Sequence, residues 1–154
     1  MKIDIRVGTL EDKGRISDIL ISSRKAFLYY APLAHTEDEV RKWVTNSLIP
    51  SGGVYVAELN RLVVAVLSTS NSKGINWIDQ MYTDPLYVGK GIGTKMLSNL
   101  LQTTSKPVRL YTFQQNTAAR RFYEQHGFQA IQFTDGRDNE EQCPDVLYEL
   151  SAKS

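Results

Sequence analysis

Eight residues in the second half of the chain decide the fold: Val88-Gly89-Lys90-Gly91-Ile92-Gly93-Thr94-Lys95. An apolar segment precedes them and a helical apolar pattern follows, which predicts a turn from a strand into a helix. Glycines let the backbone curl tightly and bring successive N–H groups close to an anion at the positive end of the helix dipole. The stretch therefore predicts either an anion-binding loop or a tight turn with nothing bound.

The spacing of these glycines excludes two common phosphate-binding loops. A P-loop needs Gly-Lys followed directly by Ser or Thr, whereas the order here is Gly93-Thr94-Lys95. The dinucleotide-binding fingerprint needs a third glycine three residues after the second, but Gly91 and Gly93 are followed there by Met96. The loop must be of a third kind.

Hydrophobic periodicity outside this loop predicts alternating strands and helices. Capping boxes, Thr9 with Asp12 and Thr36 with Glu39, indicate two helix starts, and Gly127 indicates a later helix end. The predicted strands are residues 2–7, 54–59, 62–70, 75–83, 108–113, 128–133 and 146–150. The predicted helices are residues 9–27, 36–48, 92–101 and 117–126. The remaining gaps include two turns, at residues 60–61 and 71–74. The two-residue turn predicts an antiparallel hairpin and the later βαβ order a parallel pair, so we expect a mixed sheet in an α/β (α+β) fold.

A second motif follows the loop: Asn116-x-x-Ala119-x-x-Phe122-Tyr123-Glu124-x-x-Gly127-Phe128. At 3.6 residues per turn, Asn116 and Tyr123 lie on one helix face, about 10 Å apart along the axis. An asparagine just before a helix is also a favoured N-cap, and a tyrosine is often only a packing residue. The motif alone leaves these alternatives open.

Together with Asp84-Pro85, the two motifs resemble the GCN5-related N-acetyltransferase (GNAT) family, and the likeness covers essentially the whole chain in element order. It implies a GNAT-like fold with a central, mostly antiparallel sheet of about seven strands and four flanking helices. It also implies that residues 88–94 bind the diphosphate of coenzyme A. Val88 and Thr83 depart from the family pattern, which has Gln or Arg and usually Val there. Main-chain N–H groups can still bind the diphosphate, because they do not depend on the side chains at these two positions.

The resemblance also implies roles for single residues. A bulged strand that separates from its neighbour would hold the thioester carbonyl at a main-chain N–H of Met81, Tyr82 or Thr83. Asn116 would bond the pantetheine arm, next to Ala119, and Tyr123 would protonate the departing thiolate. A phenol near pKa 10 and a thiol near 8.5 differ by about 1.5 units, which makes this proton transfer reasonable.

Asp79 is a candidate for both catalysis and substrate binding. Strict alternation in the strand 75–83 places it on one face with Trp77, Met81 and Thr83. Its carboxylate could accept a proton from an amine, directly or through water, or pair with the ammonium form. A structural ion pair is the alternative.

The resemblance places the acceptor substrate between the first two helices with their loop and the strand ends opposite. This brings in Tyr29, Tyr30 and His35, whereas the spacing of Trp43 with its neighbours predicts a core position. Residues 134–149 hold six acidic residues and one arginine, a local charge of −5. They are either a rim that attracts a cationic amine or an ordinary solvated loop.

Composition limits the remaining possibilities. The 154 residues, of which 42% are hydrophobic, predict a single domain over 1–154. One cysteine, Cys143, and two distant histidines give neither a disulfide nor a metal site, and favour a cytoplasmic location. A net charge of +1 argues against nucleic-acid binding, and the longest apolar run, 62–67, is too short to span a membrane. We also expect no targeting segment.

The first hypothesis is an enzyme that moves an acetyl group from acetyl-CoA to a primary amine of a small molecule or peptide by direct attack. The second is a non-catalytic acyl-CoA-binding or regulatory module on the same fold, since a fold does not guarantee chemistry. A third is a binder of nucleotide phosphates. The resemblance is also compatible with a homodimer.

Overall fold

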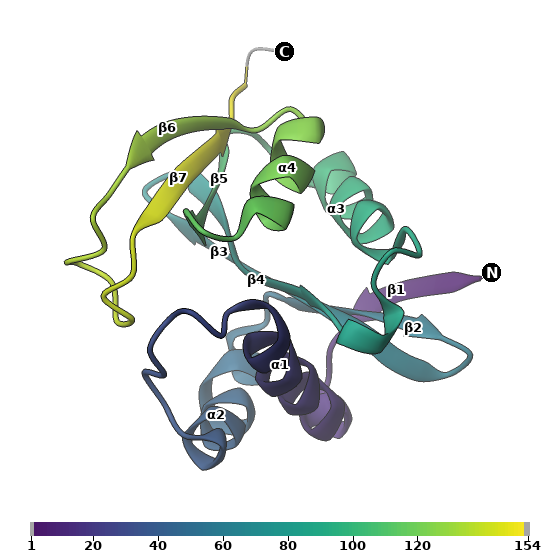
Figure 1. Cartoon of the computed structure of the whole chain (residues 1–154). Helices are drawn as coiled ribbons and strands as arrows, with labels where there is room; N and C mark the ends of the chain where they lie inside the picture. The colour runs from purple at the N-terminus through teal and green to yellow at the C-terminus, as the bar shows by residue number, and fades with distance from the viewer. Residues whose placement is uncertain (1, 153–154) are drawn as a thin grey trace.

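One seven-stranded sheet lies between two helix layers in the computed structural model, which describes residues 2–152 (Figure 1). The strands are β1 (Ile3–Val7), β2 (Val54–Leu59), β3 (Leu62–Ser72), β4 (Ile75–Thr83), β5 (Val108–Phe113), β6 (Gln129–Phe133) and β7 (Asp145–Leu150). The α-helices are α1 (Lys13–Phe27), α2 (Glu37–Trp43), α3 (Ile92–Thr103) and α4 (Thr117–Gln125). Figure 1 shows α1 and α2 on one side of the sheet and α3 and α4 on the other.

The strand order across the sheet is β1-β2-β3-β4-β5-β7-β6. Every neighbouring pair is antiparallel except β4 and β5. The parallel pair arises because α3 returns the chain to the end of the sheet at which β4 began. The predicted mixed, mostly antiparallel sheet with four α-helices is confirmed.

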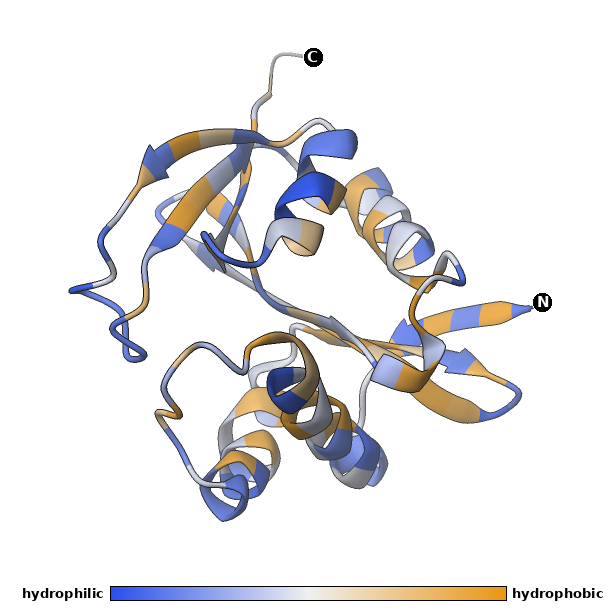
Figure 2. Cartoon of the chain, in the orientation of Figure 1, coloured by the Kyte–Doolittle hydropathy of each residue, from blue (hydrophilic) through white to orange (hydrophobic). Residues whose placement is uncertain are grey.

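Each side of the sheet has its own hydrophobic core. On the α3/α4 side, Ile92, Met96 and Leu97 of α3 are buried against the sheet together with Tyr123 of α4. On the α1/α2 side, helix α1 contributes the residues Ile16, Ile19 and Leu20. Figure 2 shows hydrophobic residues on the strands and a mainly hydrophilic loop between β6 and β7. The two cores fix both helix layers on the same sheet.

Several local predictions are confirmed by hydrogen bonds. The Thr36 hydroxyl accepts from the Glu39 N–H at 3.1 Å, and the Glu39 carboxylate accepts from the Thr36 N–H at 2.8 Å. The Asp12 carboxylate likewise accepts from the Thr9 N–H at 2.8 Å, where the short 3-10 helix η1 (Leu10–Asp12) leads into α1. These capping boxes are local, so the sequence alone could predict them.

Several boundaries differ from the prediction, most of them by one or two residues, and two of the differences change the local structure. Strand β3 continues to Ser72, so the predicted turn at 71–74 shrinks to Lys73 and Gly74, both with positive φ. The second helix is not regular to its end, because α2 passes into the π-helical turn η2 (Val44–Leu48) and the 3-10 turn η3 (Ile49–Ser51). Within residues 2–152, no helix is both long enough and apolar enough to cross a membrane.

Candidate active site

A cavity opens where β4 and β5 separate. These strands pair only at Asn76 with Val108 and at Trp77 with Arg109, so the edge of β4 that faces β5 is unpaired beyond Trp77. The resulting cavity has a volume of about 530 Å³ and is lined by both strands, the start of α4 and the β6–β7 loop. We call it the first cavity. The predicted residues Asp79, Met81, Tyr82, Asn116, Ala119 and Tyr123 all line it.

A β-bulge at Asp79 corrects the predicted alternation of β4. Ser68 of β3 pairs with Gln80 and Thr69 pairs with Ile78, which leaves Asp79 as an extra residue with no partner on β3. The bulge shifts the side-chain alternation by one residue. The prediction that Asp79 and Met81 share one face of the strand is therefore wrong. Asp79 is exposed instead, and it makes no hydrogen bond or ion pair within residues 2–152.

The glycine-rich loop has a geometry suited to an anion. Gly89 and Gly91 both have φ of +78°, and Gly91 is the N-cap of α3. The Lys95 N–H donates to the Gly91 carbonyl at 3.1 Å, whereas the N–H groups of 92–94, in the first turn of α3, find no acceptor among residues 2–152. A Cβ built on either glycine meets nothing within 4 Å, so the space over the loop is open. The loop therefore fits a diphosphate held by main-chain N–H groups.

Side chains before the loop hold it in place. The Asp84 carboxylate accepts from the Leu86 N–H at 2.9 Å, which caps the 3-10 turn η4 (Pro85–Tyr87). Arg15 of α1 donates to the same carboxylate at 2.8 Å and to the Val63 carbonyl at 2.7 Å. The sequence analysis identifies Asp84 only as part of the motif Asp84-Pro85 and predicts no role for its side chain. Its pairing with Arg15 joins segments 69 residues apart and could not be read from local pattern.

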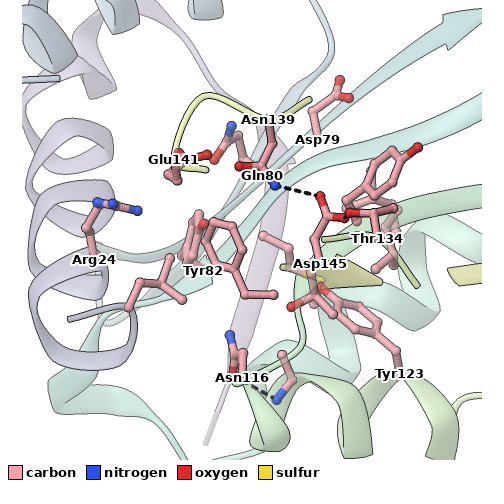
Figure 3. A pocket seen from close by; sticks show the side chains of 18 of the residues that line it. Arg24, Asp79, Gln80, Tyr82, Asn116, Tyr123, Thr134, Asn139, Glu141 and Asp145 are labelled. Carbon is pink, nitrogen blue, oxygen red and sulfur yellow. Dashed lines mark hydrogen bonds between the residues drawn. The ribbon is translucent and has the colours of Figure 1, made fainter. Parts of the chain in front are cut away.

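Helix α4 presents Asn116 and Tyr123 to the first cavity. The Asn116 Oδ1 accepts from the Ala119 N–H at 3.2 Å, so the N-cap interpretation is confirmed. This bond uses only the oxygen of the amide, and Figure 3 shows the amide nitrogen directed into the cavity. Asn116 can thus cap the helix and donate a hydrogen bond to a ligand at the same time.

Tyr123 is buried, with 7% of its surface exposed. Its ring packs edge-on against Phe122 and Phe128, and Figure 3 shows the ring extending from α4 toward the cavity. Burial raises the pKa of the Tyr123 hydroxyl well above its ordinary value, with a smaller contribution from Tyr82. The phenol therefore stays protonated at neutral pH, but its pKa lies further above that of a thiol than the predicted difference of about 1.5 units, which makes it a weaker acid than the sequence argument assumed.

A second cavity of about 680 Å³ lies between α1, α2 and the loop that precedes α2. Trp43 lines it and is 41% exposed, which corrects the predicted core position. The buried face of this segment is instead formed by Val44 and Leu48. His35 also lines the second cavity, with its Nε2 2.9 Å from a carboxylate oxygen of Glu140.

The other two predicted acceptor residues lie elsewhere. Tyr29 is 80% exposed and lines neither cavity. Tyr30 also lines neither cavity, and its hydroxyl is buried without a hydrogen-bond partner in the described part of the chain. Burial raises the pKa of Tyr30 to about 12. Its ring packs edge-on against Phe113, which gives it a packing contact between the α1–α2 loop and β5.

The two cavities share four lining residues, namely Arg24, Gln80, Tyr82 and Glu141. Eight carboxylate side chains and two cationic ones line the cavities together, so the combined surface is acidic. Sequence reasoning found the acidic residues but missed Arg24, whose guanidinium donates to the Ala31 carbonyl at 3.1 Å and to the Pro32 carbonyl. Arg24 thereby holds the loop before α2.

Sequence reasoning also missed the packing around Asp145 in the first cavity. Asp145 is 8% exposed, and its carboxylate accepts hydrogen bonds from the Thr134 hydroxyl and from the Asn139 amide, the latter at 3.1 Å (Figure 3). These bonds tie the β6–β7 loop to the first residue of β7. Within residues 2–152, no group of three or more His, Cys, Asp or Glu side chains is arranged to hold a metal ion.

Comparison with known proteins identifies the family. Residues 50–130 match the model of the acetyltransferase (GNAT) domain. The spermine/spermidine N(1)-acetyltransferase of Bacillus subtilis is 28% identical over 138 residues, which cover 84% of this chain and 89% of that protein. The PaiA N-acetyltransferase of Thermoplasma acidophilum, solved with coenzyme A, superposes with a TM-score of 0.76 at 20% identity over 98% of this chain and 99% of the other. For yncA of Salmonella typhimurium, solved with its cofactor acetyl-CoA, the TM-score is 0.75 at 19% identity, over 100% and 96% of the two chains. The family model spans more than half of the chain, and the protein therefore belongs to the GNAT family of acetyltransferases.

Proposed function

We propose that this chain, as a single domain, transfers the acetyl group of acetyl-CoA to the primary amine of a small cationic molecule. The observation that carries the proposal is the position of a buried, protonated tyrosine in the cavity between β4 and β5. The backbone geometry of the glycine-rich loop, which suits an anion, supports it. Membership of the family supports the reaction class, and the relative from Bacillus subtilis acts on spermine and spermidine.

On the donor side, the main-chain N–H groups of 88–94 would hold the diphosphate. The Asn116 amide nitrogen would donate to the pantetheine arm, next to Ala119. The unpaired edge of β4 at residues 81–83 would offer a main-chain N–H to the thioester carbonyl oxygen, where negative charge develops. Acetyl-CoA, when bound, supplies an acetyl group already activated as a thioester.

The residues of the first cavity would then move two protons. The amine must lose one proton as its nitrogen bonds to the carbonyl carbon, and Asp79 would accept it, directly or through water. The bond between that carbon and sulfur breaks, and Tyr123 would donate its hydroxyl proton to the sulfur. Figure 3 shows the Asp79 carboxylate directed away from Tyr123, an arrangement that suits proton transfer to Asp79 through water better than direct transfer.

The charge of the cavities favours a cationic acceptor. With eight carboxylates against two cationic side chains, the cavity surface attracts ammonium groups from solution and repels anions. The acidic β6–β7 loop thus acts as a rim of the site in this proposal and not only as a solvated loop. A homodimer and a cytoplasmic location stay predictions.

The decisive experiment measures thiol release from acetyl-CoA with a panel of primary amines that includes spermidine, alkylamines, an aminoglycoside and a lysine peptide, and repeats it with longer acyl donors. We expect turnover with small cationic amines. Binding of coenzyme A without turnover on any amine would instead support the non-catalytic module. Thermal stabilisation by ATP but not by coenzyme A would support the nucleotide-phosphate binder.

A further inference from the structure

Glu141 stands apart from the other carboxylates around the two cavities. It is half-buried, lines both cavities, and has no hydrogen bond or ion pair within residues 2–152. Asp79 and Asp138 are also unpaired in that range, but both are exposed and each lines only the first cavity. The remaining five have partners: Glu37 with Lys25, Glu39 with Thr36, Asp135 with Arg137, Glu140 with His35, and Asp145 with Thr134 and Asn139.

Glu141 forms no ion pair with the cationic side chain at the junction. Arg24 lines the same junction, but its guanidinium donates to the carbonyls of Ala31 and Pro32 and forms no ion pair with any residue of the described range 2–152. Burial raises the pKa of Tyr82, which lines both cavities; the positive charge of Arg24 lowers this pKa, and the negative charge of Glu141 raises it. A carboxylate partly removed from water without a donor is a binding position for a cation.

The second cavity, which begins at this junction, offers apolar walls. Leu20 and Ile21 of α1, Leu33 of the following loop, and Val40 and Trp43 of α2 line it. Methylene groups can pack on these side chains, and the exposed indole of Trp43 can also face a cation. The combination of an apolar groove with a carboxylate at its mouth fits a chain of methylenes that carries a positive charge.

We propose that Glu141 binds a second ammonium group of the acceptor, so that the preferred substrates are aliphatic diamines and polyamines. The reacting amine lies in the first cavity near Tyr123, the second ammonium lies at Glu141, and further methylenes and charges extend into the second cavity. This inference rests on the proposed function, because it concerns the acceptor of that reaction.

The test compares diamines with alkylamines of matched length, such as 1,4-diaminobutane with butylamine, and spermidine as the longer case. For the wild-type protein we expect a higher kcat/KM for each diamine than for its alkylamine. In Glu141→Gln, kcat/KM for diamines should fall by about 10- to 100-fold, mainly through KM, since a charge-assisted hydrogen bond is lost. The values for alkylamines and the KM for acetyl-CoA should not change.

Two further variants control the test. Glu11→Gln removes an exposed carboxylate that lines neither cavity, so it should keep the preference for diamines. Glu141→Asp retains the charge and should restore part of the preference lost in Glu141→Gln. Because the charge-retaining variant separates charge from packing, a folding defect in Glu141→Gln would not hide the result.

The inference is overturned if Glu141→Gln lowers kcat/KM equally for diamines and alkylamines, or if the wild-type protein does not distinguish them. Either result leaves acetyl transfer to amines standing. Absence of acetylation of every amine by the wild-type protein would instead refute the proposed function itself, and the two failures are therefore distinguishable.

Discussion

The donor side and the acceptor side of the site are built in different ways. The proposed donor side consists of two continuous motifs, the glycine-rich loop with its main-chain N–H groups and the start of α4 with the Asn116 side chain. The acceptor side is formed by side chains from α1, α2, β4 and the β6–β7 loop, which are far apart in sequence. A site made of backbone is set by local sequence, whereas a site made of side chains depends on how distant segments pack.

The largest effect should come from the residue where the two sides meet. Tyr123→Phe keeps the buried ring but removes the proton donor, so kcat should fall by roughly 10²- to 10⁴-fold, while affinity for coenzyme A stays nearly unchanged. Steady-state kinetics and calorimetry with coenzyme A measure the two quantities. Unchanged turnover in a reaction limited by chemistry would remove Tyr123 from this role.

Asp79→Asn tests the exposed carboxylate at the bulge. If Asp79 accepts the amine proton, kcat should fall by about 10²-fold, the lower end of the usual range because water can reach the site. A higher KM for the amine at constant kcat would mean that Asp79 only pairs with the ammonium. The matched control is Asp138→Asn, because Asp138 is also exposed and lines the same cavity. This variant should have unchanged kcat and unchanged KM for the amine.

Gly91→Val tests the backbone of the donor side. A β-branched residue at φ +78° costs about 1–2 kcal/mol, so the loop should rearrange and affinity for coenzyme A should fall at least about tenfold. Gly74→Val creates the same strain at φ +81° in the β3–β4 turn, which lines neither cavity. The Gly74→Val variant should have a lower free energy of unfolding and an unchanged affinity for coenzyme A. Equal affinity for coenzyme A in wild-type and Gly91→Val protein would show that residues 88–94 do not bind the diphosphate.

The smallest effects separate the two sides by their helix caps. Thr36→Ala and Asn116→Ala each remove one N-cap hydrogen bond and should each lower the free energy of unfolding by about 1 kcal/mol. Thr36→Ala loosens the start of α2 and should raise KM for the amine only. Asn116→Ala should raise KM for acetyl-CoA only. If both variants moved the same constant, the division into two sides would be wrong.

The accuracy of the sequence predictions followed the range of the interactions that decide each feature. The bounds of β2, β4 and β5 and both capping boxes were predicted, since alternation and caps involve neighbouring residues. The position of Trp43 was predicted wrongly, because the helix passes into a π-helical turn and its apolar face is filled by Val44 and Leu48. The resemblance implied a bulge in strand 75–83 and its separation from a neighbour, and both are confirmed. The alternation pattern alone did not place the bulge at Asp79, because an extra residue exists only relative to the register of β3.

By itself the sequence determined the order of the elements, the glycine-rich loop and the positions of Asn116 and Tyr123 on one helix, because these depend on backbone freedom and helical periodicity. Only the tertiary structure decided where β4 and β5 separate to form the first cavity, that Arg15 anchors Asp84, and that Glu141 has no partner among residues 2–152 at the junction with the second cavity. The reason is physical: a hydrogen-bond partner, or the lack of one, between residues remote in the chain is fixed by packing, and no local pattern specifies it.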